Sequence, residues 1–140
     1  MKKTRLEIDY GYDFSLLGVA SILKPHRLAW ELNKILDIRL VRIADHQVPE
    51  RSGDMANFTT FLHQTEITSI RLFRNRSNDE GASKWLLVPD HPRFDYILMF
   101  FSKEDDKGPW ITAALKNIPT IELSAFLPLA SLKYKENLII

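Results

Sequence analysis

Hydrophobic and polar residues alternate strictly near the start of the chain. Thr4, Leu6, Ile8 and Tyr10 share one parity, and charged residues occupy the positions between them. A period of two is typical of a β-strand with one buried face and one solvated face. The sequence therefore predicts an outer or near-outer strand over residues 4–10.

From residue 15 to residue 36 the apolar spacing becomes helical. Leu28, Leu32 and Ile35 recur at intervals of four and three, and an apolar stretch precedes them. Pro25 suits the first turn of a helix, where its missing N–H costs nothing, and it disfavours helical geometry in Lys24. The pattern predicts two helices that break near Lys24 and pack on a sheet.

Short runs rich in β-branched and aromatic residues follow, separated by turn-forming residues. They predict strands over residues 38–43, 58–63, 67–74, 84–88 and 95–102. Between residues 96 and 101 both parities are apolar, which is typical of a central strand covered on both sides. We therefore expect residues 95–102 to form the centre of the sheet.

The last part of the chain predicts one short helix and one more strand. Gly108 and Pro109 introduce a helix through Asn117, and alternating apolar residues predict a strand over 121–127, before a final helical turn after Ser131. Together the elements predict one α+β domain over residues 1–140. It has two layers, a mostly antiparallel sheet of about five or six strands with helices packed on one face.

Composition supports a folded domain and removes several classes of function. The chain has 140 residues, of which 45% are hydrophobic, so about two-thirds of the unfolded surface can be buried. Its 19 basic and 18 acidic residues nearly cancel, which leaves no overall field to attract a polyanion or an anionic membrane. Because there is no cysteine, disulfides, thiolate catalysis and cysteine-based metal sites are excluded.

Neither a targeting segment nor a membrane span is expected. The first ten residues carry a basic pair but no apolar stretch, unlike a signal peptide. The run from residue 96 to 101 is far shorter than the roughly 20 residues that a membrane helix needs. We expect a cytoplasmic protein, and the lack of cysteine fits a reducing compartment.

Residues 88–96, which read VPDHPRFDY, resemble the signature of the bacterial family named after its motif, IPExxxVDY. Three positions match and three carry conservative replacements: Pro89, Asp95 and Tyr96 match, whereas Val88, Asp90 and Phe94 replace Ile, Glu and Val. Further likeness covers the pairs Asp9-Tyr10 and Arg74-Asn75 and the segments 24–33 and 135–138. The resemblance implies a small bacterial protein of a family with no established activity, cofactor or catalytic residue.

Asp90, His91 and Asp95 form the densest group of potential acid–base or metal-binding side chains. A carboxylate beside an imidazole can transfer protons or bind a metal. Two prolines bracket the group, however, and prevent a regular helix that would place it on one face. We favour a turn in which Asp95 bonds loop amides and Tyr96 anchors the next strand, with a small-molecule binder or enzyme centred on the three residues as an alternative.

Arg71, Arg74 and Arg76 form the densest basic cluster, and no acidic residue occurs from residue 67 to residue 78. With Phe73 among them, they could contact phosphates and stack a base. Arg71 and Arg74 nevertheless have opposite parity and point to opposite faces of a straight strand. Nucleic-acid binding, to RNA in particular, is a second alternative function.

The sequence also lacks the residue patterns that are typical of nucleotide-binding, serine hydrolase and histidine metal sites. The five glycines are isolated, so neither a phosphate-binding loop nor a dinucleotide fingerprint can form. No serine lies in a GxSxG pattern, and the four histidines are scattered. The sequence therefore predicts no catalytic residue, no cofactor and no metal site.

Trp30 is the aromatic residue that core packing explains least well. It lies off the stripe formed by Leu28, Leu32 and Ile35, so it could project from the helix and mark a partner or self-association surface. Because every catalytic signature is missing, the leading prediction is a non-enzymatic interaction module. We expect it to be homo-oligomeric or to bind a bacterial protein partner.

Overall fold

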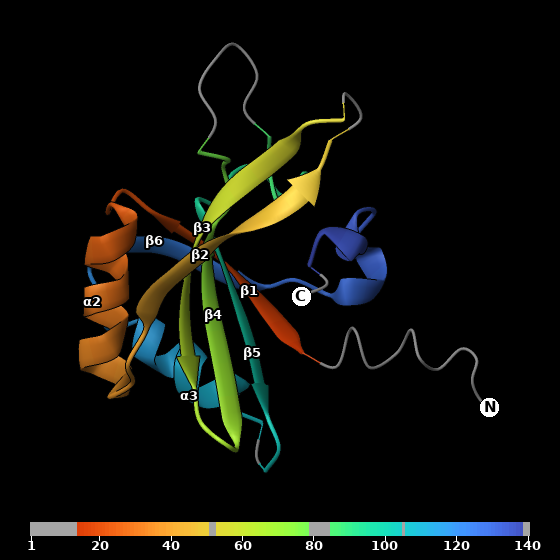
Figure 1. Ribbon diagram of the computed structural model, residues 1–140. Helices are drawn as coiled ribbons and strands as arrows, with labels where there is room; N and C mark the ends of the chain where they lie inside the picture. The colour runs from red at the N-terminus through yellow and green to blue at the C-terminus, as the bar shows by residue number, and fades with distance from the viewer. Residues whose placement is uncertain (1–13, 51–52, 79–84, 105, 139–140) are drawn as a thin grey trace, which may run out of the picture.

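One antiparallel sheet organises the computed structural model, which describes residues 14–50, 53–78, 85–104 and 106–138. The strand predicted over residues 4–10 lies outside these ranges. The six strands lie in the order β2-β3-β4-β5-β1-β6 (Figure 1). Their bounds are β1 Ser15–Ser21, β2 Val41–Pro49, β3 Met55–Gln64, β4 Thr68–Arg74, β5 Tyr96–Ser102 and β6 Ile121–Phe126.

Two helices cover one face of the sheet, α2 (Pro25–Leu36) and α3 (Gly108–Leu115). Pro25 occupies the first turn of α2, as predicted, and Asp37 ends the helix in the left-handed conformation with a φ of 53°. The helices bury Leu28, Leu32, Ile111 and Leu115 against sheet residues. Sheet residues in the same cluster include Leu17, Val19, Ile70, Leu72, Tyr96 and Leu98. The predicted α+β architecture with helices on one face is confirmed.

The first of the two predicted helices is wrong, because residues 15–21 form strand β1. β1 lies between β5 and β6, and a hydrophobic cluster covers each of its two faces. Leu17 and Val19 point to the helix face, whereas Leu16 belongs to the cluster on the other face. A short apolar run buried on both sides has no alternation, and it therefore resembles a buried helix in sequence.

The predicted centre of the sheet is confirmed. β5 lies between β4 and β1, and its residues 96–100 are all buried. The predictions over 58–63, 67–74 and 121–127 correspond to β3, β4 and β6, with small differences at their ends. The strand predicted over 38–43 starts later, because β2 begins at Val41 and continues through a bulge between Ile43 and His46 to Pro49.

Irregular segments cover the second face of the sheet. The strand predicted over residues 84–88 is absent from the described part, where only an isolated bridge joins Leu86 to Arg76. Leu87 and Val88 are buried because they pack on the sheet together with Phe94 and the C-terminal segment. That segment contains two short 3-10 helices, η2 (Leu129–Ser131) and η3 (Lys135–Leu138). Neither described α-helix is long and apolar enough to cross a membrane.

Candidate functional site

The start of β5 is tied to the end of β1 by Asp95. The Asp95 N–H donates to the carbonyl of Val19 at 2.9 Å, and its carboxylate accepts the Ser21 N–H at 2.9 Å. The Asp95 carbonyl in turn accepts the N–H of Asn75 at 2.9 Å. The carboxylate therefore satisfies a backbone donor at the point where β1 ends, as the turn interpretation predicts.

Tyr96 fixes the next connection, from β1 into α2. Its ring is buried, and its hydroxyl donates to the carbonyl of Leu23. Burial raises the pKa of Tyr96 to about 12, with a smaller contribution in the same direction from Asp95, while Arg74 acts in the opposite direction. The hydroxyl is therefore neutral at pH 7 and serves as a hydrogen-bond donor.

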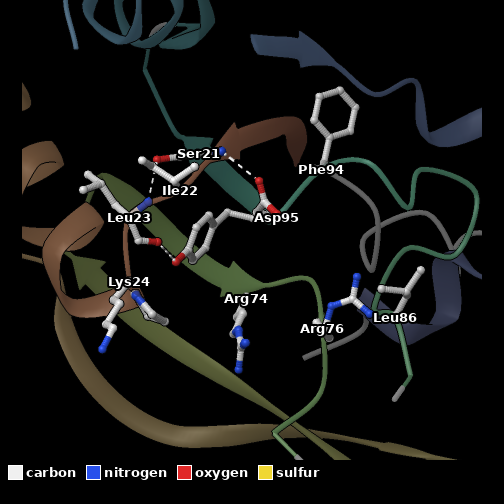
Figure 2. Close-up of a pocket in the computed structure, with 11 residues that line it drawn as sticks. Ser21, Ile22, Leu23, Lys24, Arg74, Arg76, Leu86, Phe94 and Asp95 are labelled. Atoms are coloured by element: carbon white, nitrogen blue, oxygen red, sulfur yellow. Dashed lines mark hydrogen bonds between the residues drawn. The ribbon is translucent and has the colours of Figure 1, made fainter. Parts of the chain in front are cut away.

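A cavity of about 370 Å³ opens beside these two residues, between the end of β1, the start of α2 and the ends of β4 and β5 (Figure 2). We call it the basic cavity. Its lining consists of Ser21, Ile22, Leu23, Lys24, Pro25, Arg74, Arg76, Leu86, Phe94, Asp95 and Tyr96. It thus joins segments that lie more than seventy positions apart, as the 74-residue separation of Ser21 and Asp95 shows.

Among the described residues, three cationic side chains and one carboxylate line the basic cavity. Lys24 and Arg76 are exposed, Arg74 is half-buried, and Asp95 accepts the Ser21 N–H. Lys24 is also the N-cap of α2, whose first turn contains no acidic residue. The positive end of the helix dipole therefore adds to the field of the three side chains. A protein with a net charge of only +1 concentrates positive charge at this place.

The structure separates Arg71 from the other two arginines of the predicted basic cluster. Arg71 and Phe73 share one face of β4, and Phe73 belongs to the core under the irregular segments. Burial lowers the pKa of Arg71, and the residue does not line the basic cavity. Arg74 and Arg76 do line it, so the three guanidinium groups do not form one surface.

Asp90, His91 and Asp95 are likewise not brought together in one cavity. Asp90 accepts the backbone N–H of Lys133 at 3.2 Å, and the His91 ring lies 6.0 Å from the ring of Phe94. Of the three, only Asp95 lines the basic cavity. Within the described ranges, no three His, Asp or Glu side chains are grouped as metal ligands.

Asn75 holds the signature segment against the sheet, a role that the sequence did not reveal. Its side chain is fully buried, and its amide donates to the carbonyls of His91 at 3.2 Å and Phe94 at 2.8 Å. Its side-chain oxygen accepts the Val88 N–H at 2.8 Å. Residues 88–94 thus curve around one amide, which positions Phe94 and Asp95 at the basic cavity.

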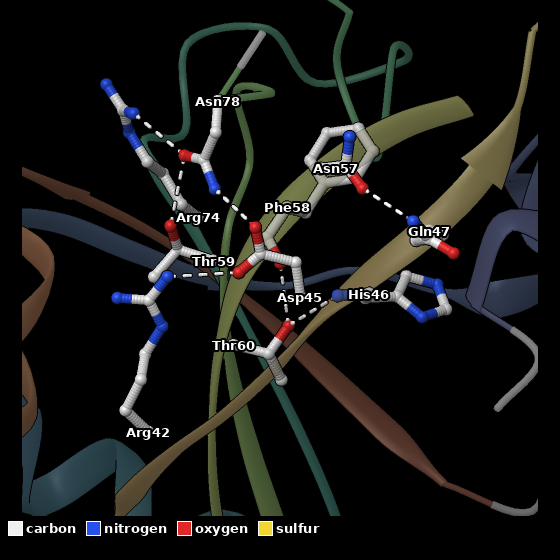
Figure 3. A network of polar contacts seen from close by, with 10 residues as sticks. All are labelled: Arg42, Asp45, His46, Gln47, Asn57, Phe58, Thr59, Thr60, Arg74 and Asn78. Carbon is white, nitrogen blue, oxygen red and sulfur yellow. Dashed lines mark hydrogen bonds and ion pairs between the residues drawn. The ribbon is translucent and has the colours of Figure 1, made fainter. Parts of the chain in front are cut away.

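Arg74 also belongs to a polar network on the outer strands (Figure 3). Its guanidinium donates to the side-chain oxygen of Asn78 at 3.3 Å, and the Asn78 amide donates to Asp45 at 3.2 Å. Asp45 is in an ion pair with Arg42 at 3.0 Å. Asn78 therefore separates Arg74 from the carboxylate of Asp45, and Arg74 keeps its remaining donors for other partners.

Trp30 projects from α2, as predicted, with 48% of its surface exposed. Arg27 and Lys34 lie over its ring, at 4.8 Å and 3.9 Å from the ring centre. These cations partly cover the indole, so its exposure alone does not identify a partner surface.

A second cavity, of about 410 Å³, lies on the other side of the sheet. Its lining includes Trp85 and Tyr134, together with Pro49 and Pro89. Among the described residues that line it, Glu50 is the only charged one.

Comparisons with known proteins do not assign the chain to a group. No family model matches the sequence, and no curated protein is similar to it. Membership of the IPExxxVDY family therefore stays a prediction, and the functional argument depends on the geometry of the basic cavity.

Proposed function

We propose that the protein binds a small phosphate-bearing molecule in the basic cavity. The observation that carries the proposal is the placement of Lys24, Arg74 and Arg76 around one cavity of about 370 Å³. That volume lies within the range of about 300–1,000 Å³ that is usual for small-molecule sites. Asp95, the one carboxylate among the described lining residues, accepts a backbone N–H.

Phosphate chemistry fits these side chains. Each guanidinium presents planar pairs of N–H donors that match phosphate oxygens, and Lys24 adds a mobile point charge. A phosphate monoester carries about 1.5 to 2 negative charges at pH 7. A single arginine neutralises only one of these negative charges, and the basic cavity supplies three cations.

The cavity is better suited to binding than to proton transfer. Tyr96 has its pKa raised to about 12 by burial, so its hydroxyl stays protonated near neutral pH, and it already donates to Leu23. Asp95 is held by the Ser21 N–H. Tyr96 is therefore not available as a general base near pH 7, which supports a binding role over catalysis.

A nucleic-acid surface has weaker support. It requires Arg71 beside Arg74 and Arg76, but Arg71 lies on the opposite face of β4 and is half-buried. The two remaining arginines line a concave site of a size suited to a small molecule.

Calorimetric titration tests the proposal. Inorganic phosphate and ribose 5-phosphate are the probes, and ribose, which lacks the phosphate group, is the control. Arg76→Gln removes an exposed cation of the basic cavity, and Arg39→Gln removes an exposed arginine outside it. A charge-assisted contact is worth about 1.5–3 kcal/mol, so Arg76→Gln should raise Kd roughly 10- to 150-fold. Arg39→Gln should leave Kd unchanged.

Three results would overturn the proposal. The first is the absence of any phosphate-dependent heat, and the second is equal weakening by the two arginine variants. The third is binding of a single-stranded RNA that Arg71→Gln weakens as much as Arg76→Gln does, because this pattern would identify the alternative nucleic-acid surface.

A further inference from the structure

The lining of the basic cavity contains apolar residues as well as cations. The apolar ones among the described residues are Ile22, Leu23, Pro25, Leu86 and Phe94. Figure 2 shows Ile22 and Lys24 on one side of the cavity and Arg76 and Leu86 on the other. Each side therefore places an apolar side chain near a cation, and a ligand held by the cations lies beside apolar surface.

Ile22 is the most exposed apolar residue of this lining, with 81% of its surface accessible. Both of its neighbours in the chain are fixed by hydrogen bonds. The Ser21 N–H donates to the Asp95 carboxylate at 2.9 Å, and the Leu23 N–H donates to the Ser21 hydroxyl at 3.2 Å. The Leu23 carbonyl also accepts the Tyr96 hydroxyl. Turning Ile22 inward would break these bonds, so its side chain stays outside the core and keeps its apolar surface at the cavity.

Leu86 is fixed on the opposite side of the cavity by an isolated bridge to Arg76. The Trp85 carbonyl accepts the Ser77 N–H at 2.8 Å, and the Leu87 N–H donates to the Asn75 carbonyl at 2.8 Å. Leu86 itself is partly exposed. The apolar surface on this side is therefore held next to the guanidinium that carries the positive charge.

The other polar residues of the lining offer little to the hydroxyl groups of a sugar. Ser21 is 4% exposed and Tyr96 is 3% exposed, and the hydroxyl of each already forms a hydrogen bond within the protein. Asp95 is exposed, but its negative charge repels a phosphate and favours a position nearer the cations. Recognition of ligand hydroxyls requires accessible polar partners, whereas the accessible surface beside the cations is provided by Ile22 and Leu86.

We propose that the preferred ligand of the basic cavity is a phosphate monoester of a small apolar alcohol. Its phosphate lies among Lys24, Arg74 and Arg76, and its apolar group covers Ile22, which removes apolar surface of both molecules from water. This inference rests on the proposed phosphate binding and adds the chemical class of the group that carries the phosphate.

Isothermal titration with a set of phosphate monoesters tests this preference. Methyl phosphate measures binding of the phosphate, n-butyl phosphate adds three CH2 groups, and ribose 5-phosphate adds a polar group instead. Because each fully buried CH2 group lowers Kd about fourfold, n-butyl phosphate should bind roughly 10- to 60-fold more tightly than methyl phosphate. It should also bind more tightly than ribose 5-phosphate. n-Butanol, which lacks the phosphate group, is the control and should not bind measurably.

Ile22→Ser tests whether the apolar group lies where the structure places it. Because Ile22 is largely exposed, the variant should fold as the wild type does. It should reduce the preference for n-butyl phosphate over methyl phosphate at least threefold and leave the Kd of methyl phosphate unchanged. Val41→Ser is the matched control, since Val41 is 49% exposed on β2 and does not line the basic cavity, and it should keep the wild-type preference.

The possible failures of this inference and of phosphate binding are distinguishable. Equal affinities for methyl and n-butyl phosphate, or tighter binding of ribose 5-phosphate, would overturn the inference and leave phosphate binding intact. A full preference for n-butyl phosphate in Ile22→Ser would also overturn it, because the apolar group would then lie elsewhere. If none of the three esters binds, the proposed phosphate binding is wrong, and the inference is wrong with it.

Discussion

At the scale of single residues, Asn75 has a structural role that no sequence pattern indicated. Its side chain is fully buried and satisfies one N–H and two carbonyls of residues 88–94. An amide is the only uncharged side-chain group that donates twice and accepts at the same place. The curve of the signature segment, and with it the position of Asp95, depends on this one group.

We expect Asn75→Ala to destabilise the protein by about 3–5 kcal/mol, because it leaves several buried backbone groups without partners, at about 1–3 kcal/mol each. Urea unfolding followed by circular dichroism measures the change. Asn117→Ala is the control, since Asn117 is exposed and, within the described chain, its side chain bonds only to the Ala113 carbonyl. A loss for Asn75→Ala no larger than for Asn117→Ala would contradict this role.

The raised pKa of Tyr96 predicts that the stability of the protein falls at alkaline pH. Burial raises its pKa to about 12, above its ordinary value of 10.0, so the folded state holds the hydroxyl proton more tightly than the unfolded state. The resulting stabilisation is complete below pH 10 and is lost as the pH rises through about 12. Tyr96→Phe should flatten the free energy of unfolding between these values, whereas Tyr134→Phe, at an exposed tyrosine, should keep the wild-type slope.

At the scale of elements, β1 illustrates why periodicity alone misassigned a segment. Residues 16–19 are all buried, since β5 and β6 flank the strand and cores cover both of its faces. Sequence periodicity reports exposure on one face, so it carries no information when both faces are covered. Gly18 is informative in retrospect, because glycine is unfavourable inside a helix and often marks a close approach inside a strand.

Gly18 provides a test of that close approach. A Cβ at Gly18 would overlap the ring of Phe94, which is 2% exposed and cannot move without disturbing the core. Gly18→Ala should therefore cost about 1–3 kcal/mol, as overpacking does. Adding Phe94→Leu should recover part of this loss in a double-mutant cycle. Additive losses in the double variant would show that the ring is not the obstacle.

Residues 85–88 show the opposite error, because the sequence predicted a strand where the structure forms none. The run from Trp85 to Val88 has strand-like composition, but it forms only one bridge, between Leu86 and Arg76. Leu87 and Val88 are buried because they cover the second face of the sheet. An apolar run that lies on a sheet and one that belongs to the sheet bury similar side chains, and sequence does not distinguish them.

At the scale of the whole molecule, the two faces of the sheet are packed against different kinds of structure. Helices α2 and α3 cover one face with regular structure, and residues 85–95 and the C-terminal segment cover the other with loops and 3-10 turns (Figure 1). The basic cavity lies where the end of β1 leads into α2, beside residues 94 and 95 of the loop cover.

The sequence by itself determined the features that local physics controls. Sequence patterns located α2, α3 and five of the six described strands, with β2 displaced at its start, Pro25 located a helix start, and the balance of charges excluded a strong overall field. Only the tertiary structure decided which distant residues meet. Lys24, Arg74 and Arg76 line one cavity with Asp95 and Tyr96 because β4, β5 and β1 are neighbours in the sheet, and Arg71 is separated from Arg74 by the parity of one strand. Strand order is set by the packing of the complete core, and no local pattern in the chain encodes it.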